Sequence, residues 1–258
     1  MALGRLALVL TLAVGSATIT GWTTAAKLPA GAPRCTKAEV RRADSGCLRA
    51  AIEATLPLLR GGQPRLGLPP LEPLLIQELT ISQGGDGPIS LALTFRDFAT
   101  TDLTTARMLS ASIDLDKMTL DAETFVGRCV ATGQYSAKGR VLVLPVSGNG
   151  TSRVVLYNTT SQWHADGKRV TKNGKDYLEV TSASIVLNPK KMEMQFDNLF
   201  NGEAELGKAM NRVLNENWQL VWREIGSSFN EAYSKVVEQH ARSLFQHVAL
   251  DDIFPDKL

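Results

Sequence analysis

The segment EAELGKAMNRVLNENWQLVWREIGSSFNEAYSKVVEQHARSLFQHV, residues 203–248, decides the fold, because it contains no proline and repeats apolar residues at helical spacing. At about 1.5 Å per residue such a helix would extend roughly 65 Å, which exceeds the width of a domain of this size. Its apolar residues follow at steps of mostly three and four: Leu206, Met210, Val213, Leu214, Trp218, Val221, Ile225, Phe229, Tyr233, Val236, Leu244 and Val248. The rest of the chain must cover this stripe.

Three interpretations of this helix compete: a membrane span, a coiled coil and a buried core helix. Charged and amide residues interrupt every window of about twenty residues, which excludes a span. The stripe keeps no strict seven-residue repeat, and bulky side chains such as Trp222 do not suit a coiled-coil seam. Gly226 lies mid-segment, where we expect a bend. The pattern predicts one long, gently bent, buried helix.

Residues 74–196 predict a sheet, since short alternating runs are separated by turn residues. The predicted strands cover residues 89–95, 107–115, 119–126, 128–135, 139–145, 153–157, 177–187 and 191–196, and residues 84–87 predict a hairpin turn. Short connections without helices imply a largely antiparallel meander. Residues 47–60 predict a short amphipathic helix that Pro57 kinks or ends. The fold class is therefore α+β, with a curved antiparallel sheet wrapped around the long C-terminal helix.

The first 26 residues predict a secretory signal peptide, because Arg5 precedes an apolar run at 6–14 and small residues suit cleavage after Ala17 or Ala26. We expect a secreted, extracellular protein. The 258 residues carry a formal net charge of +2, and removal of Arg5 with the signal peptide leaves +1. So small a net charge implies no nucleic-acid partner. No later run of about eighteen apolar residues occurs, so stable membrane insertion is not expected.

The three cysteines suit a secreted chain. Cys35 and Cys47 flank a short polar segment and are expected to form a disulfide. Cys129 is either a buried free thiol or an intermolecular link, and the absence of paired Cys or His spacing argues against zinc. Asn149 and Asn158 begin glycosylation sequons, which predict exposed positions.

The sequence offers little support for a catalytic site. The chain has no Gly-x-Ser-x-Gly elbow. His164 is expected in a loop rich in glycine and lysine, and His240 and His247 lie two helical turns apart, too far to ligate one metal. His247 and Asp251 could pair near the helix end, which suggests helix capping. No catalytic residue, metal or cofactor is predicted.

Several motifs, taken in order, resemble the insect takeout and juvenile hormone-binding proteins over nearly the whole of residues 27–258. They are CLR at 47–49, LPLL at 56–59, GLPPLEPL at 67–74, GRVLVLPVSGNG at 139–150, DNLFNG at 197–202, LNENW at 214–218 and DDIFP at 251–255. The resemblance implies a single domain in which a strongly curved antiparallel sheet rolls around the C-terminal helix, as in one half of the tubular lipid-binding proteins. It also implies a closed apolar tunnel that carries a hydrophobic small molecule such as a terpenoid or fatty-acyl compound.

One departure concerns the ligand. The hormone-binding branch of the family has a second disulfide, one cysteine of which would fall near Thr151 and Ser152 of this chain. The chain is therefore more similar to the takeout branch, and juvenile hormone is not assigned as the ligand.

A carrier must line its site with apolar groups and few polar anchors. The candidate ligand-binding residues on strands are Leu91, Leu93, Phe95, Ile113, Tyr135, Leu142 and Leu144. Those on the helix are Met210, Leu214, Trp218, Val221, Trp222, Ile225, Phe229 and Tyr233. Each also suits ordinary core packing. We expect a monomer that binds one hydrophobic small molecule, and the alternative is a secreted module that binds proteins or lipid surfaces without a dedicated ligand.

Overall fold

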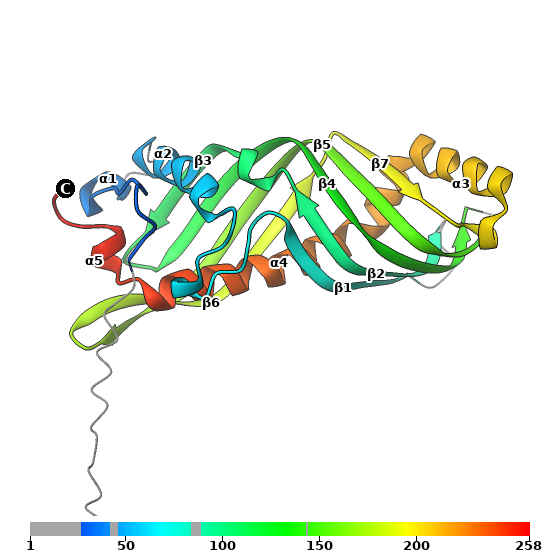
Figure 1. The fold of residues 1–258 in the computed structure, drawn as a ribbon. Helices are drawn as coiled ribbons and strands as arrows, with labels where there is room; N and C mark the ends of the chain where they lie inside the picture. Colours follow the sequence, from blue (N-terminus) through cyan, green and yellow to red (C-terminus); the bar gives the residue numbers. More distant parts are fainter. Residues whose placement is uncertain (1–26, 42–45, 84–88, 143) are drawn as a thin grey trace, which may run out of the picture.

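The protein is a curved antiparallel sheet wrapped along a long C-terminal helix, as a computed structural model of residues 27–41, 46–83, 89–142 and 144–258 shows (Figure 1). The strands are β1 (Leu74–Gln83), β2 (Ile89–Thr101), β3 (Arg107–Asp114), β4 (Thr119–Val141), β5 (Leu144–Lys172), β6 (Lys175–Asn188) and β7 (Lys191–Phe196). The predicted signal peptide and the predicted turn at 84–87 lie outside the described residues. The predicted α+β fold class is confirmed.

The sheet is built around two very long strands. Its main order is β1-β2-β4-β5-β6, while β3 pairs with the first part of β4 and β7 with the middle of β5. The prediction of separate strands at 119–126, 128–135 and 139–145 is wrong. Two residues on each strand, Gly127–Arg128 and Tyr157–Asn158, face outward together where the sheet bends, so the alternation changes phase although the β4–β5 pairing continues.

The helices gather along and at the two ends of this sheet. They are α1 (Lys37–Val40), α2 (Gly46–Thr55), α3 (Ala204–Glu216), α4 (Trp218–His247) and α5 (Leu250–Ile253), with short 3-10 turns η1 (Leu56–Leu59), η2 (Pro64–Leu66), η3 (Leu103–Thr105) and η4 (Phe200–Gly202). As predicted, the α-helical turns of α2 end before Pro57. Figure 1 shows α4 along the sheet, α3 at one end and α1, α2 and α5 at the other.

The prediction of one continuous helix with a bend at Gly226 is wrong. The helix breaks at Asn217, whose φ of −111° and ψ of 26° separate α3 from α4. Gly226 lies inside α4, and a Cβ there would lie 3.0 Å from Cε2 of Trp222. The glycine therefore makes room for the indole ring four residues earlier in the helix.

Polar side chains of α4 close the free edge of β6. They repeat every four residues, about 6 Å along a helix, and meet every second residue of the strand, about 6.7 Å along its axis. The hydrogen-bonded pairs, helix residue first, are Asn230 with Leu187, Ser234 with Ile185, Glu238 with Ala183 and Arg242 with Thr181. Because α4 also packs against β1, the helix spans the two outer strands of the sheet.

The interior divides into two main apolar clusters. The cavity core, which includes Phe95, Phe196 and Phe229, lies toward α3. The end core, which includes Val40, Ile113 and Phe254, lies beneath α1, α2 and α5. Val237 of α4 packs against both clusters, so it marks their boundary.

Candidate ligand-binding site

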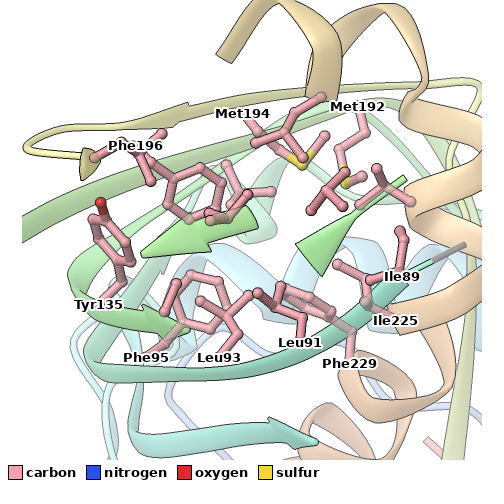
Figure 2. Close-up of a pocket in the computed structure, with 17 residues that line it drawn as sticks. Ile89, Leu91, Leu93, Phe95, Tyr135, Met192, Met194, Phe196, Ile225 and Phe229 are labelled. Atoms are coloured by element: carbon pink, nitrogen blue, oxygen red, sulfur yellow. The ribbon is translucent and has the colours of Figure 1, made fainter. Parts of the chain in front are cut away.

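An apolar cavity of about 40 Å³ lies between the sheet and α4, within the cavity core (Figure 2). Its lining residues are Ile89, Leu91, Leu93, Phe95, Tyr135, Ala137, Val141, Val146, Val154, Met192, Met194, Phe196, Leu199, Leu214, Val221, Ile225 and Phe229. Among the described lining residues, Tyr135 is the one whose side chain carries an oxygen or nitrogen atom. The site therefore suits a ligand that is apolar over most of its surface.

Two periodicities build the walls. On β2 every second residue from Ile89 to Phe95 faces the cavity, because side chains alternate across a strand. On α4 the lining residues Val221, Ile225 and Phe229 follow at steps of four, which places them on one helical face. The same rules that predicted a buried stripe thus bring the strand and helix walls face to face.

Tyr135 does not offer a free proton to this cavity. Its hydroxyl donates a hydrogen bond to the backbone oxygen of Asp197 at 2.7 Å. Burial, with a further contribution from the charge of Asp197, raises the pKa of Tyr135 to about 12. The hydroxyl is therefore neutral at physiological pH, and its proton is engaged with the backbone.

Aromatic rings contact one another at one wall of the site. Ring centroids lie 4.7 Å apart for Phe95 and Phe98, 5.9 Å for Phe95 and Phe229, and 6.1 Å for Phe98 and Phe229. Phe196 stacks edge-on against Tyr135 at 4.9 Å. Such pairs each contribute about 0.5–1.5 kcal/mol beyond the burial of their area, so they give this wall a defined shape.

The cavity is small for a lipid. Sites that enclose a drug-sized molecule have volumes of about 300–1,000 Å³, so a terpenoid or acyl chain would have to displace side chains. Met192 and Met194 line the cavity from β7 (Figure 2). Methionine is unbranched and adapts to irregular space, so these two side chains are the most readily displaced part of the wall.

Eight of the candidate residues meet around the cavity: Leu91, Leu93, Phe95, Tyr135, Leu214, Val221, Ile225 and Phe229. Four others, Met210, Trp218, Trp222 and Tyr233, pack in the cavity core without lining the cavity. Trp222 contacts Phe229 at a centroid distance of 5.9 Å from outside the lining. The Tyr233 hydroxyl shares a hydrogen bond of 2.6 Å with that of Thr100, and burial raises its pKa.

Three candidate strand residues lie away from the cavity lining. Leu142 is half-buried in the turn between β4 and β5, and Leu144, at the start of β5, is 42% exposed. Ile113 belongs to the end core, because β3 pairs with the opposite end of β4. The lining residues of β7 were not predicted. The alternation of Met192, Met194 and Phe196 in a predicted strand could have identified them.

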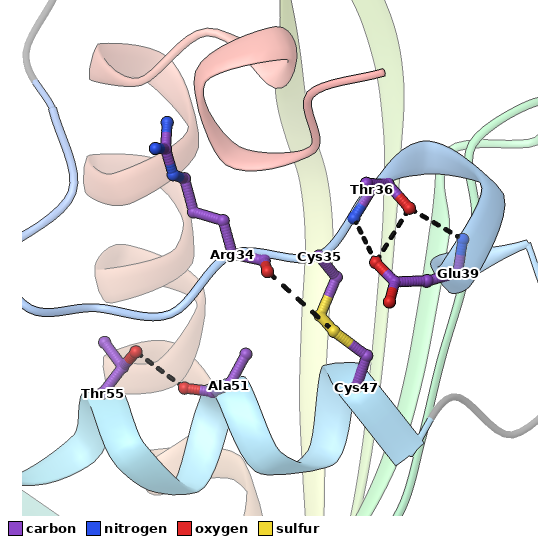
Figure 3. Close-up of a disulfide and its surroundings, with 7 residues drawn as sticks. All are labelled: Arg34, Cys35, Thr36, Glu39, Cys47, Ala51 and Thr55. Atoms are coloured by element: carbon purple, nitrogen blue, oxygen red, sulfur yellow. Dashed lines mark hydrogen bonds between the residues drawn. A yellow bond between two sulfur atoms is a disulfide. The ribbon is translucent and has the colours of Figure 1, made fainter. Parts of the chain in front are cut away.

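The end of the molecule that contains Ile113 is held together by covalent and ionic contacts. A disulfide joins Cys35 to Cys47, and thus the segment before α1 to α2 (Figure 3). The carboxylate of Glu39 caps α1 by accepting a hydrogen bond from the backbone N–H of Thr36. Lys37 forms an ion pair of 2.7 Å with Asp251 of α5. These contacts close this end over the end core.

The histidines are engaged in local contacts. His164 lies on β5, not in the expected loop, and contacts Asp121 through Nδ1 at 2.7 Å and Asp166 through Nε2 at 3.2 Å. The Nδ1 atoms of His240 and His247 each contact a backbone oxygen one helical turn back. Asp251 pairs with Lys37 and not with His247, so that suggested pair is wrong.

The remaining sequence features have defined positions. Cys129 is a buried free thiol, and burial raises its pKa to about 11. Asn149 and Asn158 are exposed on β5. Within the described ranges, no group of three or more His, Cys, Asp or Glu residues could hold a metal ion. None of the helices among these residues combines the length and apolar character needed to cross a membrane.

A family model and several known proteins match this chain over most of its length. Residues 7–255 match the family model of haemolymph juvenile hormone binding protein. The circadian clock-controlled protein daywake of Drosophila melanogaster is 25% identical over 220 residues, which cover 82% of this chain and 84% of that protein. The "Putative beta-carotene-binding protein" of Schistocerca gregaria is 22% identical over 212 residues, covering 81% and 83% respectively.

The crystal structure of Epiphyas postvittana Takeout 1 matches this structure with a TM-score of 0.75 at 24% identity, covering 81% of this chain and 95% of that chain. The two proteins therefore share the curled sheet and the long C-terminal helix. The family whose model matches consists of binding proteins and not of enzymes. With the model matched over residues 7–255, this chain belongs to the takeout and haemolymph juvenile hormone binding protein family.

Proposed function

We propose that this protein is a secreted carrier that binds one hydrophobic small molecule between the sheet and α4. The observation that carries the proposal is the cavity, whose described lining side chains have no oxygen or nitrogen apart from the engaged hydroxyl of Tyr135. Removing an apolar ligand from water into such a site gains about 25 cal/mol for each Å² buried. Such a lining suits the binding of a ligand and not its chemical conversion.

The names of related proteins support the class of ligand. The family is named for juvenile hormone, and the Schistocerca gregaria relative is named for beta-carotene. Both names indicate long, largely apolar molecules. A ligand of this kind would extend the small cavity into a tunnel by displacing Met192 and Met194. The haemolymph named by the family, the predicted signal peptide and the disulfide support secretion.

Native mass spectrometry tests the proposal. The delipidated protein is exposed to beta-carotene and, separately, to methyl farnesoate, an apolar terpenoid ester. We expect a complex with one ligand per chain for at least one of them. Failure of both to bind, together with strong binding to phosphatidylcholine liposomes, would instead support a lipid-surface module.

A pair of variants locates the binding site. Ile225→Trp adds bulk to the cavity wall and should abolish uptake while the fold is retained, at a stability cost of about 1–3 kcal/mol. Leu206→Trp places the same side chain on an exposed position of α3 and should bind as the unmodified protein does. Uptake by the Ile225 variant equal to that of the control would exclude the cavity as the site.

A further inference from the structure

Three hydroxyl-bearing residues lie together on the inner face of the sheet, and we refer to them as the hydroxyl girdle. They are Thr124 of β4 and Thr159 and Ser161 of β5, whose exposed fractions are 5%, 3% and 4%. Thr124 pairs directly with Ser161, so their Cβ atoms are about 4.5–5.5 Å apart. Thr159 lies two residues before Ser161 and faces the same side of the sheet.

The girdle separates the two main apolar clusters. Its neighbours Val126 and Leu187 belong to the cavity core, whereas Ala122 and Ala165 pack against the end core. Apolar residues at these three positions would be sufficient for packing in a continuous sheet wall. Three hydroxyl groups therefore lie between the two apolar clusters, where buried polar groups need hydrogen-bond partners.

Thr124 and Thr159 of the girdle differ in the hydrogen bonds of their hydroxyl groups. Oγ1 of Thr124 accepts a hydrogen bond of 2.9 Å from the indole nitrogen of Trp163. Oγ1 of Thr159 is buried and has no hydrogen-bond partner among the described residues. Thr100, another buried threonine on this sheet, differs because its hydroxyl meets that of Tyr233 at 2.6 Å. The Thr159 hydroxyl is thus available to a group that enters the interior.

The girdle lies farther along β5 than the cavity, since Val154 lines the cavity and the buried Leu156 lies between Val154 and Thr159. Met192, which lines the cavity, pairs with Leu156 of β5, and Thr159 follows three residues later. Asn158 has a φ of 47° and is exposed. This turn of the backbone between the two positions lets both Leu156 and Thr159 face inward. A ligand that extends from the cavity along β5, past Met192 and Leu156, would reach the girdle.

We propose that the hydroxyl girdle binds the single neutral oxygen-bearing group, an alcohol or a carbonyl, of a ligand whose apolar chain occupies the cavity. This proposal rests on the carrier function proposed above. A threonine hydroxyl both donates and accepts, so it can pair with either group. A carboxylate does not suit the position, because the strand neighbours Ala122, Val126, Trp163 and Leu187 are uncharged.

The test compares three tritiated ligands of equal chain length: n-hexadecane, 1-hexadecanol and hexadecanoic acid, at about pH 8. The unmodified protein should bind the alcohol roughly three- to tenfold more tightly than the alkane, as one hydrogen bond in a buried site provides. The ionised acid should bind more weakly than the alcohol. Equal affinities for alkane and alcohol, or a preference for the acid, would overturn the proposal. Failure of all three to bind, in a protein that takes up beta-carotene or methyl farnesoate, would overturn this proposal alone, whereas failure of those two ligands as well would remove the carrier function.

Variants assign the preference to the girdle. Thr159→Val keeps the shape of the side chain and should reduce the affinity for 1-hexadecanol to that for n-hexadecane, leaving the alkane unchanged. Thr100→Val removes a partnered buried hydroxyl and should keep the preference. Ser161→Ala provides a second test if Thr159→Val does not fold, since it should weaken the preference. An unchanged preference in the folded girdle variant, or the same loss in Thr100→Val, contradicts the assignment.

Discussion

The side-chain amide of Asn211 pairs with the backbone of Phe196 in the way a neighbouring strand would. Its Oδ1 accepts a hydrogen bond from the Phe196 N–H, and its Nδ2 donates to the Phe196 carbonyl, each at 2.9 Å. Asn215 repeats this arrangement with Met194 at 2.8 Å, four residues later on α3 and two residues earlier on β7. Because Phe196 and Met194 line the cavity, these asparagines hold one of its walls.

Removal of the Asn211 amide should destabilise the protein, because the amide pairs with the backbone of β7. Asn211→Leu leaves a buried backbone N–H and carbonyl of Phe196 without partners, which should lower the free energy of unfolding by about 2–4 kcal/mol. Urea denaturation measures the change. Gln219→Leu, at an exposed position of α4, is the control and should alter stability by less than about 0.5 kcal/mol. Equal effects would show that the pairing with β7 contributes nothing.

Replacement of Gly226 by alanine should be unfavourable despite the higher helix propensity of alanine. The new Cβ would lie 3.0 Å from Cε2 of Trp222, so the crowding should cost more than the roughly 1 kcal/mol that propensity contributes. Thermal unfolding should show a lower Tm. Gly207→Ala on α3 is the matched control, because its Cβ would meet Leu199 at 3.8 Å and the Tm should rise.

A double variant decides the cause. In a Trp222→Leu background, where the indole ring is absent, Gly226→Ala should no longer lower the stability. The double variant is therefore compared with Trp222→Leu alone. Additive losses would show that the indole ring is not what requires glycine at this position.

Protonation of His164 should stabilise the fold. Its hydrogen bond to Asp121 is the main cause that raises the pKa of His164 above the ordinary 6.5, and the charge of Asp166 adds to it. Because the folded-state pKa is raised, the contribution is fully present below the unfolded pKa. It is lost as pH rises from about 6.5 through the folded value.

Titration of the His164 ring by NMR measures the folded pKa directly. Asp121→Asn should lower it, because the carboxylate that holds the proton becomes a neutral amide. His164→Gln should remove the corresponding part of the dependence of stability on pH. A pKa that does not change in Asp121→Asn would show that this contact is absent in solution.

The thiol of Cys129 should be inert in the native protein. With a pKa of about 11, roughly one thiol in a thousand is ionised at about pH 8, and the side chain is buried as well. Ellman's reagent should therefore label one cysteine only after unfolding in guanidinium without reductant. Rapid labelling of the native protein, absent from a Cys129→Ser variant, would contradict the burial of this residue.

The prediction succeeded where local pattern determines structure. The alternation from Ile89 to Phe95 and the steps from Val221 to Phe229 identify the cavity-facing residues, because side-chain direction depends on the strand and helix periods alone. It failed at Ile113, whose alternation is equally regular. That residue lies in the other half of the interior because β3 pairs with the far end of β4, a relationship between distant segments.

The sequence by itself determined the types of the elements, the apolar stripe of the C-terminal helix, the pairing of Cys35 with Cys47 and the family, since these follow from local periodicity, spacing and motif order. Only the tertiary structure decided that the helix breaks at Asn217, that Gly226 serves the ring of Trp222, and that β7 supplies Met192 and Met194 to the cavity. The reason is physical: a periodic pattern states which side of an element is buried. Which neighbour fills that side, and how much space remains there, depends on strand pairing and side-chain packing across the whole chain.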